Sequence, residues 1–119
     1  GKSIAFVGPS GGGKSTIVNI LERFYEPNSG ELFLDGTNFS SLSPSQLRSV
    51  IALVGQEPIL FRGTIADNVR LGVEGVSDEE VRIACKYANA AHFIEDFPAD
   101  YSTIVGGKGG SLSGGQKQR

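Results

Sequence analysis

The sequence is poor in features that mark several classes of protein. Cys85 is its single cysteine, so no disulfide can form within the chain, and this composition fits a reducing compartment. No apolar run approaches the roughly 18 residues of a membrane-spanning helix, so we expect that this stretch does not cross a bilayer. The 11 basic and 13 acidic residues give a net charge of -2. Because the basic residues form no block, we expect no nucleic-acid partner.

The ends of the chain also lack the usual marks of natural termini. No initiator Met and no signal peptide precede the apolar run at residues 4–7, and the last residues read as a helix that has only begun. We therefore expect a partial sequence. Its 119 residues are enough for one small domain, and 39% hydrophobic with 20% charged residues is typical of a globular chain.

Glycine is the residue in excess, with 17 in the chain. The glycines gather at residues 8–13 and 106–115 and follow no period, which predicts special loops instead of a repetitive chain. Between these clusters the pattern predicts strands first and helices later. We place a subdomain boundary near residues 72–77, which divides the chain into 1–71 and 72–119.

Local patterns predict the individual elements. Residues 4–7 and 50–54 are apolar runs that read as buried strands, and residues 31–35 read as a further strand closed by an Asp35-Gly36 turn. Five helices are predicted. The first begins at Lys14 and has one apolar face, formed by Ile17, Ile20, Leu21 and Phe24, and the second runs from a Ser43-Pro44 cap through Arg48. The third begins at a capping box of Ser77 and Glu80 and turns Val81, Ala84, Cys85 and Ala88 inward, the fourth covers Ala91 to Glu95, and the fifth begins at Ser113.

The first glycine cluster matches the phosphate-loop pattern G-x-x-x-x-G-K-[ST], between a predicted strand and a predicted helix. Glycines let the backbone curl so that several N–H groups meet phosphate oxygens, and the helix N-terminus adds a partial positive charge. We expect Lys14 to reach the β- and γ-phosphates, Ser15 to ligate Mg²⁺ and Thr16 to hold the α-phosphate. The predicted nucleotide-binding residues are Gly8, Pro9, Ser10, Gly11, Gly12, Gly13, Lys14, Ser15 and Thr16.

A second motif narrows the choice among proteins with a phosphate loop. Residues 112–116 read LSGGQ, about 100 residues after the phosphate loop, and here the chain resembles the ATP-binding cassette (ABC) ATPases. The resemblance implies an α/β fold, a P-loop NTPase core with a mixed β-sheet and an α-helical signature subdomain, which stops before the Walker B strand. Ser113 can cap a helix whose first N–H groups Gly114 and Gly115 leave uncovered, which makes a second anion site.

The resemblance also implies partners. In the family, two nucleotide-binding domains pair head to tail, and the signature of one closes on the γ-phosphate held by the other. Ser113, Gly114, Gly115 and Gln116 would then bind ATP in trans. Transmembrane domains of the same transporter would be the other partner, which implies a place at the cytoplasmic face of a membrane.

Gln56 begins the segment QEPILF, which resembles the family's Q-loop. The resemblance makes Gln56 a catalytic candidate beside Lys14, because the Q-loop glutamine reaches Mg²⁺ and the attacking water. Residues 63–69 and 102–106 resemble the corresponding segments of P-glycoprotein-type multidrug exporters. One departure is Gly107, where exporters usually carry a glutamate that contacts the membrane helices of the opposite half.

The family's aspartate for Mg²⁺, its water-polarising glutamate and its γ-phosphate histidine all follow the signature helix, and the adenine-stacking aromatic precedes the first strand. None of them is among these residues, so we expect the 119 residues alone to bind but not hydrolyse ATP. We also expect them to aggregate or stay partly molten, because an absent central strand leaves strand edges unpaired.

Besides the motor domain of an exporter, two other interpretations remain. One is a soluble ABC ATPase of DNA repair or translation, and the other is a naturally short polypeptide that at most binds nucleotide. The remaining reactive side chains have structural interpretations. We expect His92 on a helix surface, Cys85 in the core, and Asp78, Glu79 and Glu80 at a helix N-terminus, where carboxylates are favoured.

Overall fold

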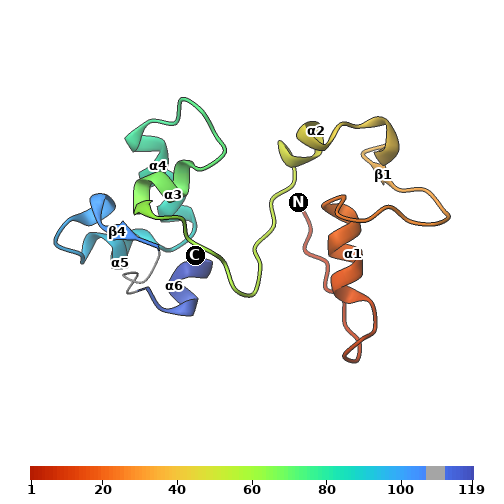
Figure 1. The fold of residues 1–119 in the computed structure, drawn as a ribbon, viewed down its shortest axis with the longest axis horizontal. Coiled ribbons are helices and arrows are strands. Elements are labelled where there is room, and N and C mark those ends of the chain that lie inside the picture. Colours follow the sequence, from red (N-terminus) through yellow and green to blue (C-terminus); the bar gives the residue numbers. More distant parts are fainter. Residues whose placement is uncertain (107–111) are drawn as a thin grey trace. The chain divides into compact units, whose positions relative to one another are not determined.

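A computed structural model describes residues 1–106 and 112–119. The chain forms two compact units, Gly1–Leu53 and Val54–Arg119 (Figure 1). The sequence-based division at residues 71 and 72 marks a subdomain of a larger fold, and it stays a prediction.

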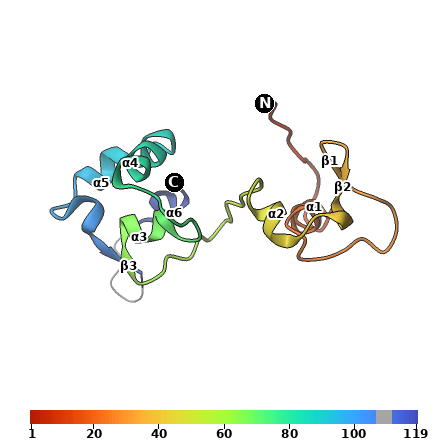
Figure 2. The same cartoon turned by 90° about the horizontal axis from the view of Figure 1, so that it is seen from above.

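The first unit contains one longer helix, a hairpin and a short capped helix. Its elements are α1 (Lys14–Leu21), β1 (Phe33–Leu34), β2 (Thr37–Asn38), the 3-10 helix η1 (Phe39–Ser41) and α2 (Pro44–Arg48). β1 and β2 pair antiparallel, as Figure 2 shows, with Leu34 opposite Thr37. The predicted turn between them is confirmed, because Asp35 and Gly36 have φ of 47° and 82°, the positive values that a two-residue hairpin loop favours.

The strands predicted at residues 4–7 and 50–54 are not found. Neither segment is assigned to a strand, and Ile4 and Val7 are 81% and 93% exposed. A strand needs a neighbouring strand for its N–H and C=O groups, and among the described residues these two segments pair with none. The apolar face predicted for α1 is likewise not buried, and within this unit only Phe39 and Leu47 are buried.

The second unit is mainly helical. Its elements are β3 (Gly63–Thr64), α3 (Ile65–Arg70), α4 (Asp78–Tyr87), α5 (Ala91–Glu95), the 3-10 helix η2 (Asp100–Ser102), β4 (Ile104–Val105) and α6 (Gly114–Gln118). β3 and β4 pair antiparallel, with Gly63 opposite Val105, so the two exporter-like segments of the sequence lie side by side.

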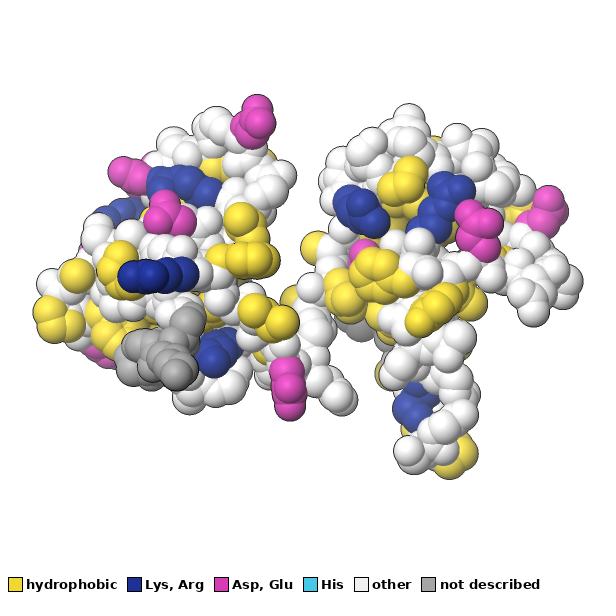
Figure 3. Space-filling view, in the orientation of Figure 1, with side chains coloured by type: hydrophobic (Ala, Val, Ile, Leu, Met, Phe, Trp, Pro, Cys, Tyr) yellow, Lys and Arg dark blue, Asp and Glu magenta, His cyan; other side chains and the backbone are white. Residues whose placement is uncertain are grey.

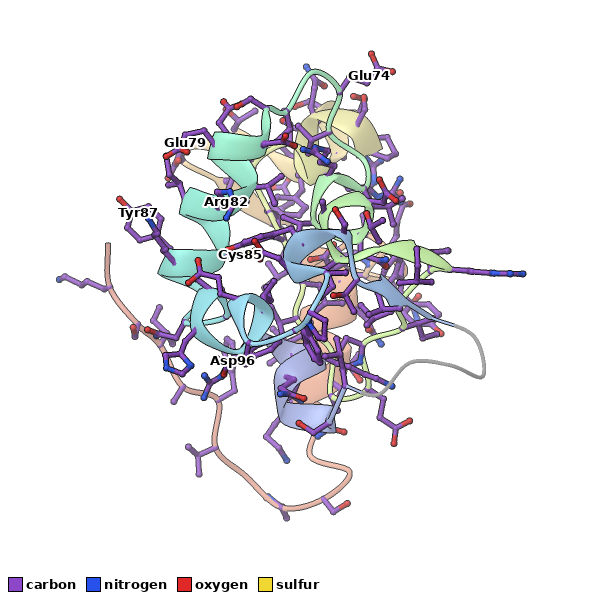
Figure 4. All side chains as sticks on the ribbon, turned by 90° about the vertical axis from the view of Figure 1, so that its left-hand side faces the viewer. Glu74, Glu79, Arg82, Cys85, Tyr87 and Asp96 are labelled. Carbon is purple, nitrogen blue, oxygen red and sulfur yellow. The ribbon has the colours of Figure 1, made fainter. Side chains whose placement is uncertain are left out.

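One hydrophobic core holds the second unit together. Its buried members are Ile65, Val81, Cys85, Ala90, Ala91, Ile94, Tyr101 and Val105. The predicted inward face of α4 is confirmed for Val81 and Cys85, which are 1% and 4% exposed. The prediction that Ala84 faces inward is wrong, since Ala84 is exposed. The buried face of α4 is narrower than the apolar spacing of its sequence indicated. Figure 4 shows Glu79 and Tyr87 projecting outward from α4, on which Cys85 also lies.

Helix starts follow the capping signals closely. Ser43 and Ser77 each form a capping box, with Gln46 and Glu80 respectively, and α2 has proline in its first turn as predicted. Arg70 adds a tether across the loop before α4, since its guanidinium donates to the Val76 carbonyl at 3.1 Å and pairs with Asp78.

His92 lies on the surface of α5, as predicted, with its side chain 93% exposed. No helix within the described residues is long and apolar enough to cross a membrane.

Candidate functional site

The phosphate loop is built by its backbone conformation. Gly13 caps α1 with φ of 82°, and Gly11 has φ of 79°, values that other residues rarely adopt. A side chain at either position would meet nothing within 4 Å, so the space in front of the loop is open. The loop also closes on itself, since the Gly12 N–H donates to the Pro9 carbonyl at 3.1 Å. The result is a curled backbone that leads directly into a helix N-terminus.

Lys14 holds the two sides of this loop together. Its ammonium donates to the Gly8 and Pro9 carbonyls at 2.9 and 2.6 Å. These bonds draw the side chain back over the loop, so the positive charge lies at the mouth of the curl. An ammonium group has three donors, so one stays available for an anion.

The residues after Lys14 complete an anion site. Ser15 and Thr16 are exposed in the first turn of α1, whose leading N–H groups have no acceptor within the helix. The Gly13 carbonyl already accepts from the Ile17 N–H at 3.1 Å, so the regular ladder starts there. The donors of this turn, the Lys14 charge and the open glycine loop fit a phosphate chain, and the Ser15 hydroxyl fits a Mg²⁺ ligand.

The signature residues form a second helix start. Ser113 caps α6, accepting from the Gln116 N–H at 3.2 Å, while the Gln116 side-chain oxygen accepts from the Ser113 N–H at 2.9 Å. The sequence predicted the Ser113 cap but not that Gln116 completes it. The S-x-x-Q spacing, which is typical of a capping box, could have indicated this role. Gly114 and Gly115 are exposed in the first turn, with nothing within 4 Å of either Cβ position.

Gln56 lies in an exposed loop beside this helix. A cleft of about 500 Å³ is lined by residues of the loop and of the signature helix: Gln56, Glu57, Pro58, Ile59, Leu60, Gly106, Gly114 and Lys117. The structure therefore brings Gln56 and Gly114 to one cleft, although 58 positions separate them in the sequence. The phosphate loop belongs to the other unit.

Two side-chain amides that the sequence did not single out contact the Gln56 loop. Gln118 donates to the Gln56 carbonyl at 2.9 Å. Asn68 bonds both backbone groups of Phe61, accepting from its N–H at 2.8 Å and donating to its carbonyl at 2.9 Å. No sequence signal marks the contact of Gln118 with Gln56, which spans 62 positions. Gly107 lies outside the described residues.

Arg82, Asp100 and Tyr101 form a polar cluster at the helical core, in which Tyr101 is buried and the side chains of the other two are each 42% exposed. Arg82 stacks over the Tyr101 ring at 4.5 Å and pairs with Asp100 at 3.5 Å. Burial raises the pKa of the Tyr101 hydroxyl, and it also raises the pKa of the Cys85 thiol, which keeps both groups protonated and unreactive near neutral pH. Within the described residues, no group of three or more His, Cys, Asp and Glu side chains is arranged to hold a metal ion.

Comparison with known proteins gives a consistent result. A family model described as ABC transporter matches residues 1–119. Relatives include the "Mitochondrial potassium channel ATP-binding subunit" of Mus musculus at 54% identity, "ABC transporter B family member 2" of Dictyostelium discoideum at 51%, and "Multidrug resistance protein 1" of Entamoeba histolytica at 54%. Each match covers 100% of this chain.

A solved structure is similar as well: "Structure of a bacterial Atm1-family ABC exporter with ATP bound" has 43% sequence identity to this chain over the aligned residues and gives a TM-score of 0.84. The alignment covers 92% of this chain and 19% of that structure's chain. The chain spans 17%, 8% and 9% of the three relatives, so it corresponds to a small part of each.

Proposed function

The chain belongs to the ABC transporter family and has the ABC ATPase fold, and from this premise we propose that it binds ATP as part of an exporter's nucleotide-binding domain. In the intact protein, ATP binding and hydrolysis drive the export of a substrate across a membrane. The observation that carries the proposal is the open glycine loop before α1, with the Lys14 ammonium drawn onto the Gly8 and Pro9 carbonyls. This arrangement concentrates N–H donors and one positive charge where a triphosphate would lie.

The remaining roles follow from the chemistry of each side chain. Ser15 and Gln56 supply the hydroxyl and amide oxygens that suit Mg²⁺, which neutralises phosphate charge when bound. Thr16 and the backbone N–H groups of the loop hold phosphate oxygens. Gln56 also orients the attacking water.

The signature helix serves a neighbouring nucleotide-binding domain. Ser113, Gly114 and Gly115 leave the start of α6 exposed, which supports a role in binding the γ-phosphate held by a second domain. The Gln116 side chain shapes this helix start through the capping box. A head-to-tail dimer at the cytoplasmic face of a membrane, coupled to transmembrane domains, is the corresponding assembly.

Nucleotide binding by two lysine variants tests the proposal. We expect Lys14→Ala to weaken the binding of a fluorescent ATP analogue at least tenfold, because it removes the charge at the mouth of the loop. Lys2→Ala is the matched control, since Lys2 is an exposed lysine that precedes the loop, and it should leave binding unchanged. Equal affinity for Lys14→Ala and the unaltered chain would remove the basis of the proposal.

We also propose that the 119 residues alone do not turn over ATP. The family's water-polarising glutamate follows the signature helix and is not among these residues, so bound nucleotide meets no such base. Phosphate release, followed in the same samples, should stay at background. Steady release that disappears in Lys14→Ala would contradict this expectation.

A further inference from the structure

Gln118, at the last position of α6, makes a contact that none of the assigned roles requires. Its side-chain amide donates to the main-chain carbonyl of Gln56 at 2.9 Å, across 62 positions of sequence. Both residues are exposed, so neither is held in place by burial. The bond therefore joins the signature helix to the loop that carries the candidate catalytic amide.

The site of attachment matters because it leaves the Gln56 side chain free. A bond to the backbone carbonyl fixes where the Gln56 Cα lies, while the side-chain amide can still turn toward a ligand. The loop and α6 line the same cleft of about 500 Å³, in which Gln56 and Gly114 both take part. A tether at this point sets the distance between the loop and the start of the signature helix.

The far end of the loop is anchored in a similar way. Asn68, on α3, bonds the N–H and the carbonyl of Phe61 and also donates to the Thr64 carbonyl at 2.9 Å. Ile59, between the two anchors, is 82% exposed. The two ends of the loop, Gln56 and Phe61, are therefore held by side-chain amides, while Leu60 packs against the helical core. Of the two anchors, only Gln118 comes from the signature helix.

We propose that Gln118 is a positioning residue for Gln56: it couples the start of the Q-loop to the signature helix, so that movement of α6 carries the Gln56 backbone with it. The inference rests on the proposed function, because positioning has a consequence only where Gln56 acts on nucleotide. Gln118 itself touches neither nucleotide nor metal in this proposal. Its loss should change how often Gln56 is correctly placed, and not how tightly ATP binds at the phosphate loop.

The test uses the full-length protein that contains this sequence, with three variants. Gln118→Met keeps the length of the side chain but removes the donor, and Gln118→Lys restores a donor at similar reach. Arg119→Met is the matched control, because Arg119 also tethers the end of α6, donating to the Asn89 carbonyl at 2.9 Å and not to the Q-loop. Hydrogen exchange of residues 55–58 and steady-state ATP hydrolysis are measured for each.

For Gln118→Met we expect faster exchange at residues 55–58 and a fall in kcat on the order of tenfold with KM within about twofold, because misplacement of a catalytic group affects turnover more than binding. Gln118→Lys should recover most of the loss, and Arg119→Met should change exchange near Asn89 only. Unchanged exchange and kcat in Gln118→Met, or an equal kcat loss in Arg119→Met, would overturn the inference. An unaltered protein that neither binds nor hydrolyses ATP would instead overturn the proposed function, while the exchange data would still report the tether.

Discussion

At Gly106 the fold depends on the absence of a side chain. The backbone has φ of 84°, and a Cβ there would overlap the Phe61 carbonyl and lie 2.7 Å from the Arg62 nitrogen. This close approach lets Gly106, the residue directly after β4, lie against the end of the Q-loop. Two separate constraints, conformation and space, therefore act at one position.

Substitution by alanine should separate those two constraints. We expect Gly106→Ala to lower the free energy of unfolding of the second unit by roughly 1–3 kcal/mol more than Gly75→Ala does. Gly75 has φ of 75° but nothing within 4 Å of its Cβ position, so it shares the conformational cost without the overlap. Denaturant unfolding of both variants gives the difference. Equal losses would mean that the strand pair moves aside at little cost.

Cys85 is a residue whose role was predicted from its position on an apolar helical face. The thiol is buried in the helical core, and burial raises its pKa, as expected of a small apolar packing residue. His92 is confirmed in the same way as an exposed helix residue.

At the scale of elements, the short helices of this chain depend on their caps. α2, α3, α4 and α6 all begin with a capping box, formed by Ser43, Thr64, Ser77 and Ser113 respectively. Helices of five to ten residues have little stability of their own, so capping contributes a large share of what keeps each start in place.

The cap of α4 should make that helix sensitive to acid. The Ser77 N–H and hydroxyl donate to the Glu80 carboxylate at 2.9 and 2.7 Å, and these bonds lower the pKa of Glu80. A carboxylate whose pKa is lowered by folding stabilises the helix above the ordinary carboxyl range of about 4, and that contribution is lost as the pH falls below it.

We therefore expect Glu80→Gln to make amide protection in α4 less dependent on pH between about 5 and 3 than in the unaltered chain, because glutamine accepts the same bonds without titrating. Glu79→Gln is the control, since Glu79 is in the same turn but outside the capping box. The measurement is hydrogen exchange of α4 amides, compared across pH after correction for the intrinsic rates. An identical pH dependence in Glu80→Gln would exclude the cap as the cause.

At the scale of the whole chain, the two units differ in how much apolar surface they bury. The second unit has a connected core of eight buried residues, whereas the first buries only Phe39 and Leu47. In the first unit Ile4, Val7 and Val50 are more than two-thirds exposed. Figure 3 shows hydrophobic side chains at the surface of both units. Such surface is characteristic of segments that associate with other chains or other parts of a fold.

Hydrogen exchange of the isolated 119 residues should reflect this difference. We expect strong protection in α4 and α5, and weak protection throughout residues 1–30, since opening free energy follows local burial. The chain should also bind a hydrophobic dye, and it should aggregate at high concentration. Uniform protection in a soluble monomer with one sharp melting transition would contradict this expectation.

The features that follow from the sequence are local ones. The phosphate loop, the LSGGQ motif and the helix caps depend on residue types a few positions apart. Most helix starts could therefore be predicted from spacing, and the family and the fold class from the resemblance of the two motifs to those of ABC ATPases. The roles of Lys14, Ser15, Gln56 and Ser113 remain predictions that the binding experiments test.

Tertiary structure decided whatever depends on a distant partner. Residues 4–7 and 50–54 have the composition of strands, but a strand exists only where a neighbour accepts and donates its hydrogen bonds, and among the described residues none does so. For the same reason, the sequence could not predict the β3–β4 pair, the contact of Gly106 with Phe61 or the bond from Gln118 to Gln56. Each joins segments tens of residues apart, and composition and periodicity carry no information about which distant backbone a side chain will reach.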